Sequence, residues 1–327
     1  MNKIHKGLCA GLLASVFAFG ALPAQAETYI VAVGAASNSL QGRSAQKFAE
    51  ELQARLGDAD KVEFYADAQL GDEKELMQKL RLGTVQFTLI SSIMTNVAPE
   101  FALFDMPFLV KDREHLKAID ANLVKTELAP KAEAAGLHVI STWENGFRQI
   151  TNNSRPINTP ADLDGLKIRT PSSEWRVAMF KEWGSNPTPM AFSEVFVALQ
   201  TGTMDGQENP LTNIVGANFQ EVQKYLSLTG HVYSPTYLTT GAGTWGKLPE
   251  NVKTAVSEVA ASVQDWSLNE GETADRELVD KVRAAGVEVN EADKSAFIAA
   301  SAPIYEAFAA KVEGGDKLVG LAQRLAD

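Results

Sequence analysis

Cysteine is almost absent from this chain of 327 residues. The single copy, Cys9, lies in an apolar N-terminal stretch, without lipoprotein-type spacing before it. A mature chain that lacks this stretch can form neither a disulfide framework nor a thiol nucleophile. Disulfide-stapled folds and cysteine-dependent enzymes are therefore excluded.

Histidine is also scarce, with four copies. His115, His138 and His231 lie far apart, and no His-x-x-x-His pattern or carboxylate–histidine cluster surrounds them. The sequence therefore predicts no metal site. The Gly-x-Ser-x-Gly turn of a hydrolase nucleophile is missing as well. A catalytic triad built from distant positions stays open, because triads are defined by geometry.

Positive charge and long apolar runs are limited too. The chain has 30 lysine and arginine residues against 41 aspartate and glutamate residues, a net charge of −11. This balance makes nucleic acid and anionic membranes poor partners. Beyond the N-terminal stretch, no apolar run reaches the length of about 18 residues that a membrane span requires.

The first 26 residues have the organisation of a signal peptide. Lys3 and Lys6 give a basic start, an apolar stretch covers 8–22, and Ala-Gln-Ala at 24–26 is a small-x-small cleavage site. We therefore expect residues 1–26 to be removed on export, and the mature protein to lie in the periplasm.

The remaining sequence alternates between strand and helix patterns. Residues 28–34 read as a strand, and 45–56 as an amphipathic helix. A second helix is predicted after Asp72, which forms a capping box with Glu75, and Gly83 closes it. This βαβ rhythm predicts an α/β fold with a parallel sheet covered by helices.

Two later segments bear on domain organisation. The stretch 143–184 contains a cluster of Asn, Ser and Pro, and we interpret it as a crossover between domains rather than a core element. From Pro249 to about Ala285 the pattern is helical, with an apolar stripe through Val252, Val256 and Val259. A helix of this length approaches ~50 Å and could span two domains.

A glycine-rich run, Gly241–Leu248, resembles a nucleotide-binding loop. It fits the phosphate-loop pattern until Leu248, where a magnesium-binding serine or threonine is required. No clear buried strand follows the long helix behind it. We therefore interpret the run as a glycine-rich surface turn that leads into the helix at Pro249.

Arg148 and Arg169 both stand in apolar surroundings, in "NGFRQIT" and "LKIRTP". A helix is predicted to start near Ser172 or Ser173, so Arg169 lies close to a helix N-terminus, where anions are favoured. A buried arginine is costly unless an anion pairs with it. The sequence leaves open whether that anion is an internal carboxylate or a bound ligand.

Four segments carry a resemblance to a known family: "GLKIRTP", "NPTPMAFSEVFVALQTGTMDGQENP", "NGFRQITNNSRPI" and "AQLGDEKELMQKLRLG". They resemble the solute receptors of TRAP transporters, the tripartite ATP-independent periplasmic systems for organic acids. The resemblance implies two α/β lobes joined by crossing hinge segments and backed by a long shared helix. The expected lobes are residues 27–145 with about 236–275, and about 146–235 with about 276–327.

The resemblance also implies a ligand site. Arg169 would clamp the ligand carboxylate bidentately, because a planar guanidinium offers two parallel donors. Arg148 would add a second cation, Asn209 a hydrogen bond, and Phe192 a packing surface. Further expected contacts lie at positions with weaker correspondence: Ser91, Asp72 (which its capping role already explains) and Glu144, with Glu174 as another candidate selector. Gly34 and Ser91 depart from the Asn and Glu of sialate-binding members, which argues against sialate.

The resulting hypothesis is a periplasmic receptor that captures a small organic carboxylate, such as a uronate, and delivers it to TRAP permease subunits. Neither a cofactor nor a metal is expected, nucleic acid is not a partner, and a monomer is expected. A secreted enzyme acting on a carboxylated substrate is the alternative, and a sensory receptor is a weaker one.

Overall fold

The computed structural model describes residues 26–326. The predicted signal peptide and Cys9 lie outside these residues, apart from Ala26 at its end. Among the described residues, no helix is long and apolar enough to cross a membrane.

The strands form one continuous path in the order β2-β1-β3-β9-β4-β7-β5-β6, with β8 attached to β4 and β10 attached to β8. Their bounds are β1 Thr28–Ala32, β2 Lys61–Tyr65, β3 Phe87–Ile90, β4 Leu137–Asn152, β5 Lys167–Thr170, β6 Asn186–Pro189, β7 Gly206–Pro210, β8 Tyr225–Leu228, β9 Tyr233–Gly241 and β10 Glu288–Glu291. The sheet is mixed, because β1–β2, β1–β3, β5–β6, β5–β7 and β8–β10 pair in parallel, whereas β4 and β9 run antiparallel to their neighbours.

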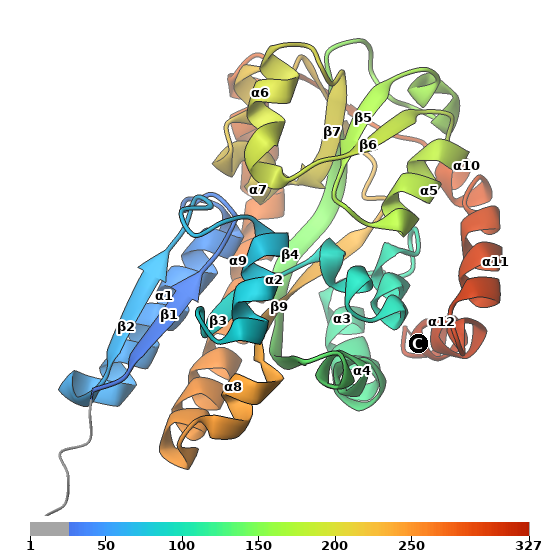
Figure 1. Ribbon diagram of the computed structural model, residues 1–327. Coiled ribbons are helices and arrows are strands. Elements are labelled where there is room, and N and C mark those ends of the chain that lie inside the picture. The colour runs from blue at the N-terminus through green and yellow to red at the C-terminus, as the bar shows by residue number, and fades with distance from the viewer. Residues whose placement is uncertain (1–25, 327) are drawn as a thin grey trace, which may run out of the picture.

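Strand β4 connects the two halves of this path. Residues 137–147 pair with β9, and from Arg148 onward the strand pairs with β7 and β8. Figure 1 shows β4 and β9 crossing from the half that contains β1–β3 to the half that contains β5–β7. The interpretation of 143–152 as lying outside the core is therefore wrong: these residues continue a strand, and all but Phe147 are buried. Most of these buried residues are polar, and hydrogen bonds such as Arg148 to Glu208 and Asn145 to Ser91 satisfy them inside the fold.

Helices cover both halves of the sheet (Figure 1). Their bounds are α1 Leu40–Leu56, α2 Glu73–Leu82, α3 Arg113–Ile119, α4 Ala129–Ala134, α5 Glu174–Glu182, α6 Val195–Gln200, α7 Leu211–Gly216, α8 Ala242–Lys247, α9 Glu250–Ala284, α10 Lys294–Ala299, α11 Ala302–Lys311 and α12 Gly315–Arg324. Short 3₁₀ segments include η2 Ser92–Asn96, η3 Pro99–Asp105 and η6 Phe192–Glu194, and η4, Asp120–Leu128, is a π-helix.

Helix α9 is the predicted long helix, with 35 residues. It packs against α1, β4 and α7, so it contacts both halves of the molecule. Figure 1 shows it running behind them. The C-terminal helices also reach both halves: α11 packs on α5, whereas the His115 ring of α3 hydrogen-bonds the Ala322 carbonyl of α12 at 2.7 Å.

The ends of α2 match the sequence prediction. Asp72 accepts a hydrogen bond from the Glu75 amide at 3.0 Å, Glu75 accepts one from the Asp72 amide at 3.1 Å, and Gly83 closes the helix with a left-handed φ of 72°. The glycine-rich run does not match. It forms the short helix α8, which packs against α2, β9 and β4, rather than a turn, and Leu248 at the end of this helix is buried.

Candidate ligand-binding site

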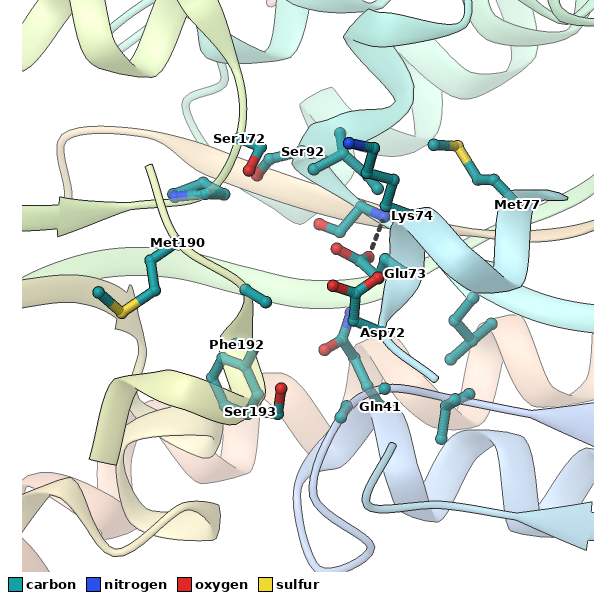
Figure 2. Close-up of a pocket in the computed structure, with 18 of the residues that line it drawn as sticks. Gln41, Asp72, Glu73, Lys74, Met77, Ser92, Ser172, Met190, Phe192 and Ser193 are labelled. Carbon is teal, nitrogen blue, oxygen red and sulfur yellow. Dashed lines mark hydrogen bonds between the residues drawn. The ribbon is translucent and has the colours of Figure 1, made fainter. Parts of the chain in front are cut away.

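A cavity of about 650 Å³ lies between the two halves of the molecule. One wall is formed by the start of α2 and the end of β3, and the other by β5, the segment before α6, and the end of β7. Figure 2 shows Asp72, Glu73 and Lys74 on the first wall, with Met190 and Phe192 opposite them. Six of the seven predicted ligand contacts line this cavity: Arg169, Arg148, Asn209, Phe192, Ser91 and Asp72.

Arg169 is a buried cation without a carboxylate partner among the described residues. It lies on β5, two residues before Pro171, and Ser173 then caps α5. Nε and Nη2 both donate to the Met190 carbonyl, at 3.0 and 2.5 Å, and no ion pair within 4.0 Å involves Arg169 among residues 26–326. Burial lowers the pKa of Arg169 to about 10, although nearby Glu208 and Glu73 oppose the shift. The guanidinium therefore lacks the anion that a buried arginine requires.

Arg148, on β4, lines the same cavity as Arg169, but it is already paired. Its Nη2 donates to Glu208 Oε1 at 2.9 Å and to Asn209 Oδ1 at 3.1 Å, and its Nε also contacts the Glu208 carboxylate. None of the hydrogen bonds found in the described chain uses Nη1 of Arg148. One nitrogen of this group thus remains for a ligand, whereas its charge is shared with the protein.

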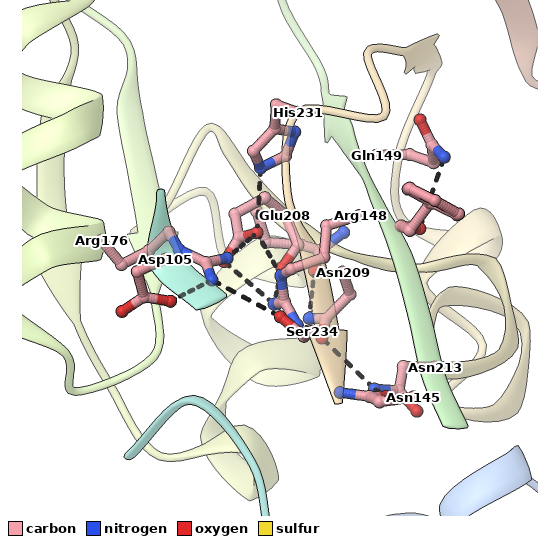
Figure 3. Close-up of polar contacts among 12 residues, drawn as sticks. Asp105, Asn145, Arg148, Gln149, Arg176, Glu208, Asn209, Asn213, His231 and Ser234 are labelled. Carbon is pink, nitrogen blue, oxygen red and sulfur yellow. Dashed lines mark hydrogen bonds and ion pairs between the residues drawn. The ribbon is translucent and has the colours of Figure 1, made fainter. Parts of the chain in front are cut away.

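Glu208 is the centre of a buried ionic cluster (Figure 3). Besides Arg148, its carboxylate accepts a bond from Arg176 Nη1 at 2.7 Å and contacts His231 Nε2 at 3.2 Å; Arg176 Nη2 also pairs with Asp105 at 2.6 Å. Burial alone would raise the pKa of Glu208, but the two guanidinium groups hold it well below its usual range. In this cluster two cations, Arg148 and Arg176, balance two carboxylates.

The floor of the cavity carries a chain of amides that joins the two halves. Asn213 donates to Asn145 at 3.0 Å, and Asn145 donates to the Ser91 hydroxyl at 3.1 Å. Ser91 in turn donates to the Pro235 carbonyl at 2.8 Å. Asn213 Oδ1 is buried and has no hydrogen-bond partner among the described residues. Figure 3 shows Asn209, Asn213 and Asn145 following one another.

Two carboxylates face this floor from the start of α2. Asp72 uses one oxygen to cap the helix, as predicted, while it also lines the cavity. Glu73 accepts the backbone N–H of Ser91 at 2.8 Å. Burial raises the pKa of Glu73 to about 7, and the Ser91 N–H and the Arg169 charge only partly oppose this shift.

The apolar wall consists of Met77 on one side and Met190 and Phe192 on the other. Phe192 is partly buried, and its ring packs against Phe219 with centroids 5.6 Å apart. It therefore contributes both to the cavity wall and to the core of its half.

Glu144 lies outside the cavity, contrary to the sequence expectation. Its side chain is fully buried. The carboxylate accepts a hydrogen bond from Arg113 at 2.7 Å and another from the Tyr233 hydroxyl. Burial raises its pKa to about 7 despite these partners. Arg113 of α3 and Tyr233 of β9 each bind one oxygen of the Glu144 carboxylate. Neither oxygen therefore remains for a ligand. Glu174, at the start of α5, does not line the cavity either.

Sequence reasoning missed Glu73 and Asn213. Glu73 is the first residue of a helix whose capping residue was already a candidate, so its position next to Asp72 was an available signal. Asn213 follows "QENP" by three residues and needed the turn into α7 to reach the cavity. Among residues 26–326, no group of three or more His, Cys, Asp and Glu side chains could hold a metal ion.

The chain matches the family model DctP, described as bacterial extracellular solute-binding protein family 7, over residues 31–311. It is 34% identical to the 2,3-diketo-L-gulonate-binding periplasmic protein of Escherichia coli over 298 residues, covering 90% of each chain.

Two solved structures have the same fold. One is a TRAP periplasmic solute-binding protein of Roseobacter denitrificans with bound L-galactonate, with 34% identity, a TM-score of 0.84, and 93% and 99% of the two chains covered. The other is the sugar acid binding protein of Advenella mimigardefordensis in complex with galactonate, with 29% identity, a TM-score of 0.88, and 92% and 99% covered. The predicted two-lobed fold is thereby confirmed. The chain belongs to the DctP family of TRAP transporter substrate-binding proteins, whose members are receptors for small organic acids rather than enzymes.

Proposed function

We propose that this protein binds a hydroxylated carboxylic acid of the sugar-acid class, such as a uronate or an aldonate, between its two lobes. The observation that carries the proposal is Arg169, a cation that lines the cavity and has no carboxylate partner within 4.0 Å among the described residues. A ligand carboxylate supplies the missing anion, and a planar guanidinium suits its two oxygens.

The other contacts follow from the geometry around Arg169. Arg148 offers its free nitrogen to the same carboxylate, and Asn209 lies beside it, held by Arg148. Phe192 and Met190 pack on the carbon chain of the ligand. Ser91 and Asp72 lie on the opposite wall, where the remainder of the ligand would extend.

A sugar acid agrees with the volume of the cavity and with the ligands named for the relatives. About 650 Å³ is within the range of small-molecule sites and holds a six-carbon acid. The relatives named above include one called diketogulonate-binding and two with bound galactonate. All of these ligands combine a carboxylate with several hydroxyl groups.

The same proposal covers location and partners. Export through the predicted signal peptide would bring a monomeric receptor to the periplasm, where it would pass its ligand to the TRAP membrane subunits. Its negative charge makes nucleic acid an unsuitable partner. Mass spectrometry of the periplasmic fraction should find a mature chain that begins at Glu27, and a retained N-terminus would contradict export.

A thermal-shift screen tests the ligand class directly. Aldonates, uronates, dicarboxylates and keto acids are added in turn, followed by titration calorimetry of each acid that raises the melting temperature. A ligand at a hundredfold excess over its Kd raises stability by about 2.7 kcal/mol. The expected result is stabilisation by aldonates or uronates that is lost in Arg169→Ala. Stabilisation by dicarboxylates or keto acids alone, or by none of these acids, would overturn the proposal.

A further inference from the structure

Two polar groups of the cavity besides Arg169 are acceptors with unused capacity. Glu73 presents a carboxylate to the cavity, and among the described residues only one of its oxygens is engaged, by the Ser91 N–H at 2.8 Å. On the cavity floor, Asn213 Oδ1 is a buried acceptor without a partner in the described chain. A ligand group that meets these atoms must donate hydrogen bonds, because buried acceptors left unpaired are costly. A hydroxyl group can donate, whereas an ionised carboxylate can only accept.

The buried charges of the cavity lead to the same conclusion. The positive charges of Arg148 and Arg176 are matched by Glu208 and Asp105. Arg169 is therefore the one buried cation left for a ligand among the described cavity residues, and it matches a single carboxylate. Lys74 and Arg81 also line the cavity, but both are exposed at its rim, where solvent screens their charge.

We propose that Glu73 is a specificity residue. Its carboxylate accepts hydrogen bonds from the hydroxyl groups of the ligand tail and repels a second ligand carboxylate. This inference rests on the proposed function, since it assumes that the first carboxylate sits on Arg169. It assigns the site to acids with one carboxylate and a hydroxylated tail, and it excludes dicarboxylates of equal length.

The ionisation of Glu73 makes the selectivity depend on pH. The charged groups that influence it are Asp72 on its own helix, and Arg169 and Arg148 from the opposite strands. With a pKa of about 7, Glu73 is mostly charged at pH 8 and mostly protonated at pH 6. Ligand carboxylates titrate near pH 4 and stay ionised throughout this range. Rejection of a dicarboxylate should therefore weaken at the lower pH.

Galactonate and galactarate form a matched pair of probes. They share a six-carbon chain with four secondary hydroxyl groups, and differ only in whether the far end is a CH₂OH group or a carboxylate. Titration calorimetry at pH 8 and pH 6 is carried out on the wild type, on Glu73→Gln and on Glu114→Gln. Glu114 is an exposed residue of α3 outside the cavity, so its variant controls for the change in net charge.

The wild type and Glu114→Gln should bind galactonate at least about thirtyfold more tightly than galactarate at pH 8, because like charges a few ångströms apart repel strongly in a partly buried site. At pH 6 the ratio of the galactarate Kd to the galactonate Kd should fall severalfold. In Glu73→Gln the ratio should be within about threefold of unity at both pH values. Melting curves confirm that each variant is folded.

Two results would overturn the inference while leaving the proposed function intact. One is equal binding of both acids by the wild type at pH 8, and the other is a preference for galactonate that persists in Glu73→Gln. A wild type that binds neither galactonate, galactarate nor any other acid of the screen would instead refute the proposed function, and the inference with it.

Discussion

Arg169 and Glu73 lie on opposite walls of one cavity, and neither has an ion-pair partner within 4.0 Å among residues 26–326. Each influences the ionisation of the other. The site therefore holds one cation and one ionisable carboxyl group without a direct ion pair between them. We expect a bound acid to add a direct ion pair at Arg169.

Substitution of Arg169 by lysine keeps the charge and removes the planar pair of donors. We expect affinity for the ligand to fall by at least about a hundredfold, because charge-assisted hydrogen bonds contribute ~1.5–3 kcal/mol each. Unliganded stability should stay unchanged or rise, since the buried cation has no anion to lose. Calorimetry and melting curves on the same variant measure both. Lower stability with normal affinity would remove Arg169 from the binding site.

Substitution of Glu208 by glutamine should destabilise the whole molecule. The change leaves Arg148 and Arg176 with reduced compensation in a fully buried cluster, and breaking such a pair costs ~3–5 kcal/mol. Urea denaturation measures the loss of unfolding free energy. Glu258→Gln is the matched control, because its pair with Arg55 is exposed, and it should change stability by less than about 1 kcal/mol. Equal effects of the two substitutions would contradict the prediction.

His231 should make the protein sensitive to acid. Burial lowers its pKa to about 4, so between pH 6.5 and pH 4 the unfolded chain binds a proton that the folded chain does not. Stability contributed by the neutral ring is complete above pH 6.5 and is lost as the pH falls towards 4, by up to ~3 kcal/mol. Glu73 and Glu144, whose pKa values are raised, change stability in the opposite direction over part of this range.

Comparison with His231→Gln isolates this contribution, because the two glutamates are common to both proteins. Urea denaturation at pH 7, 5.5 and 4.5 should show that the stability difference between wild type and variant shrinks as the pH falls. A difference that does not vary with pH would show that His231 does not titrate in this way.

Gly271 gives α9 its close contact with β4. A Cβ atom there would lie 2.4 Å from Cγ of Glu144, a fully buried side chain. Gly271→Ala should therefore destabilise by ~1–3 kcal/mol through overpacking. Gly243→Ala, in α8, should instead stabilise by up to ~1 kcal/mol, because its Cβ meets no atom within 4 Å and alanine favours helix. Thermal melts of the two variants that shift in the same direction would contradict this assignment.

Local sequence signals predicted local structure well. The capping box of Asp72 and Glu75, the αL glycine at 83, and the cap of α5 at Ser173 all involve residues within a few positions of one another. Such contacts form by short-range hydrogen bonding, so their residue types reveal them. The glycine run at 241–248 was misread because glycine favours turns on average, whereas α8 gains its stability from packing against the strand before it.

Pairings across the fold could not be read from the sequence. Glu208 lies 60 residues from Arg148 and 32 from Arg176, and nothing around Glu208 shows which cation it meets. For the same reason Glu144 looked available, although Arg113, 31 residues away, occupies it. The family resemblance supplied six residues of the cavity wall, because it carries three-dimensional information that local patterns lack. The lobe boundaries and the ligand contacts remain predictions.

The two lobes are joined by hydrogen-bonded strands and a continuous helix rather than by flexible loops. Residues 137–152 form one strand shared by both halves, and α9 extends past the junction without a break. Any movement of one lobe against the other would therefore have to bend these two elements. If the lobes close on a ligand, bending β4 and α9 would take up part of the binding free energy, and the straightening of these elements would favour reopening.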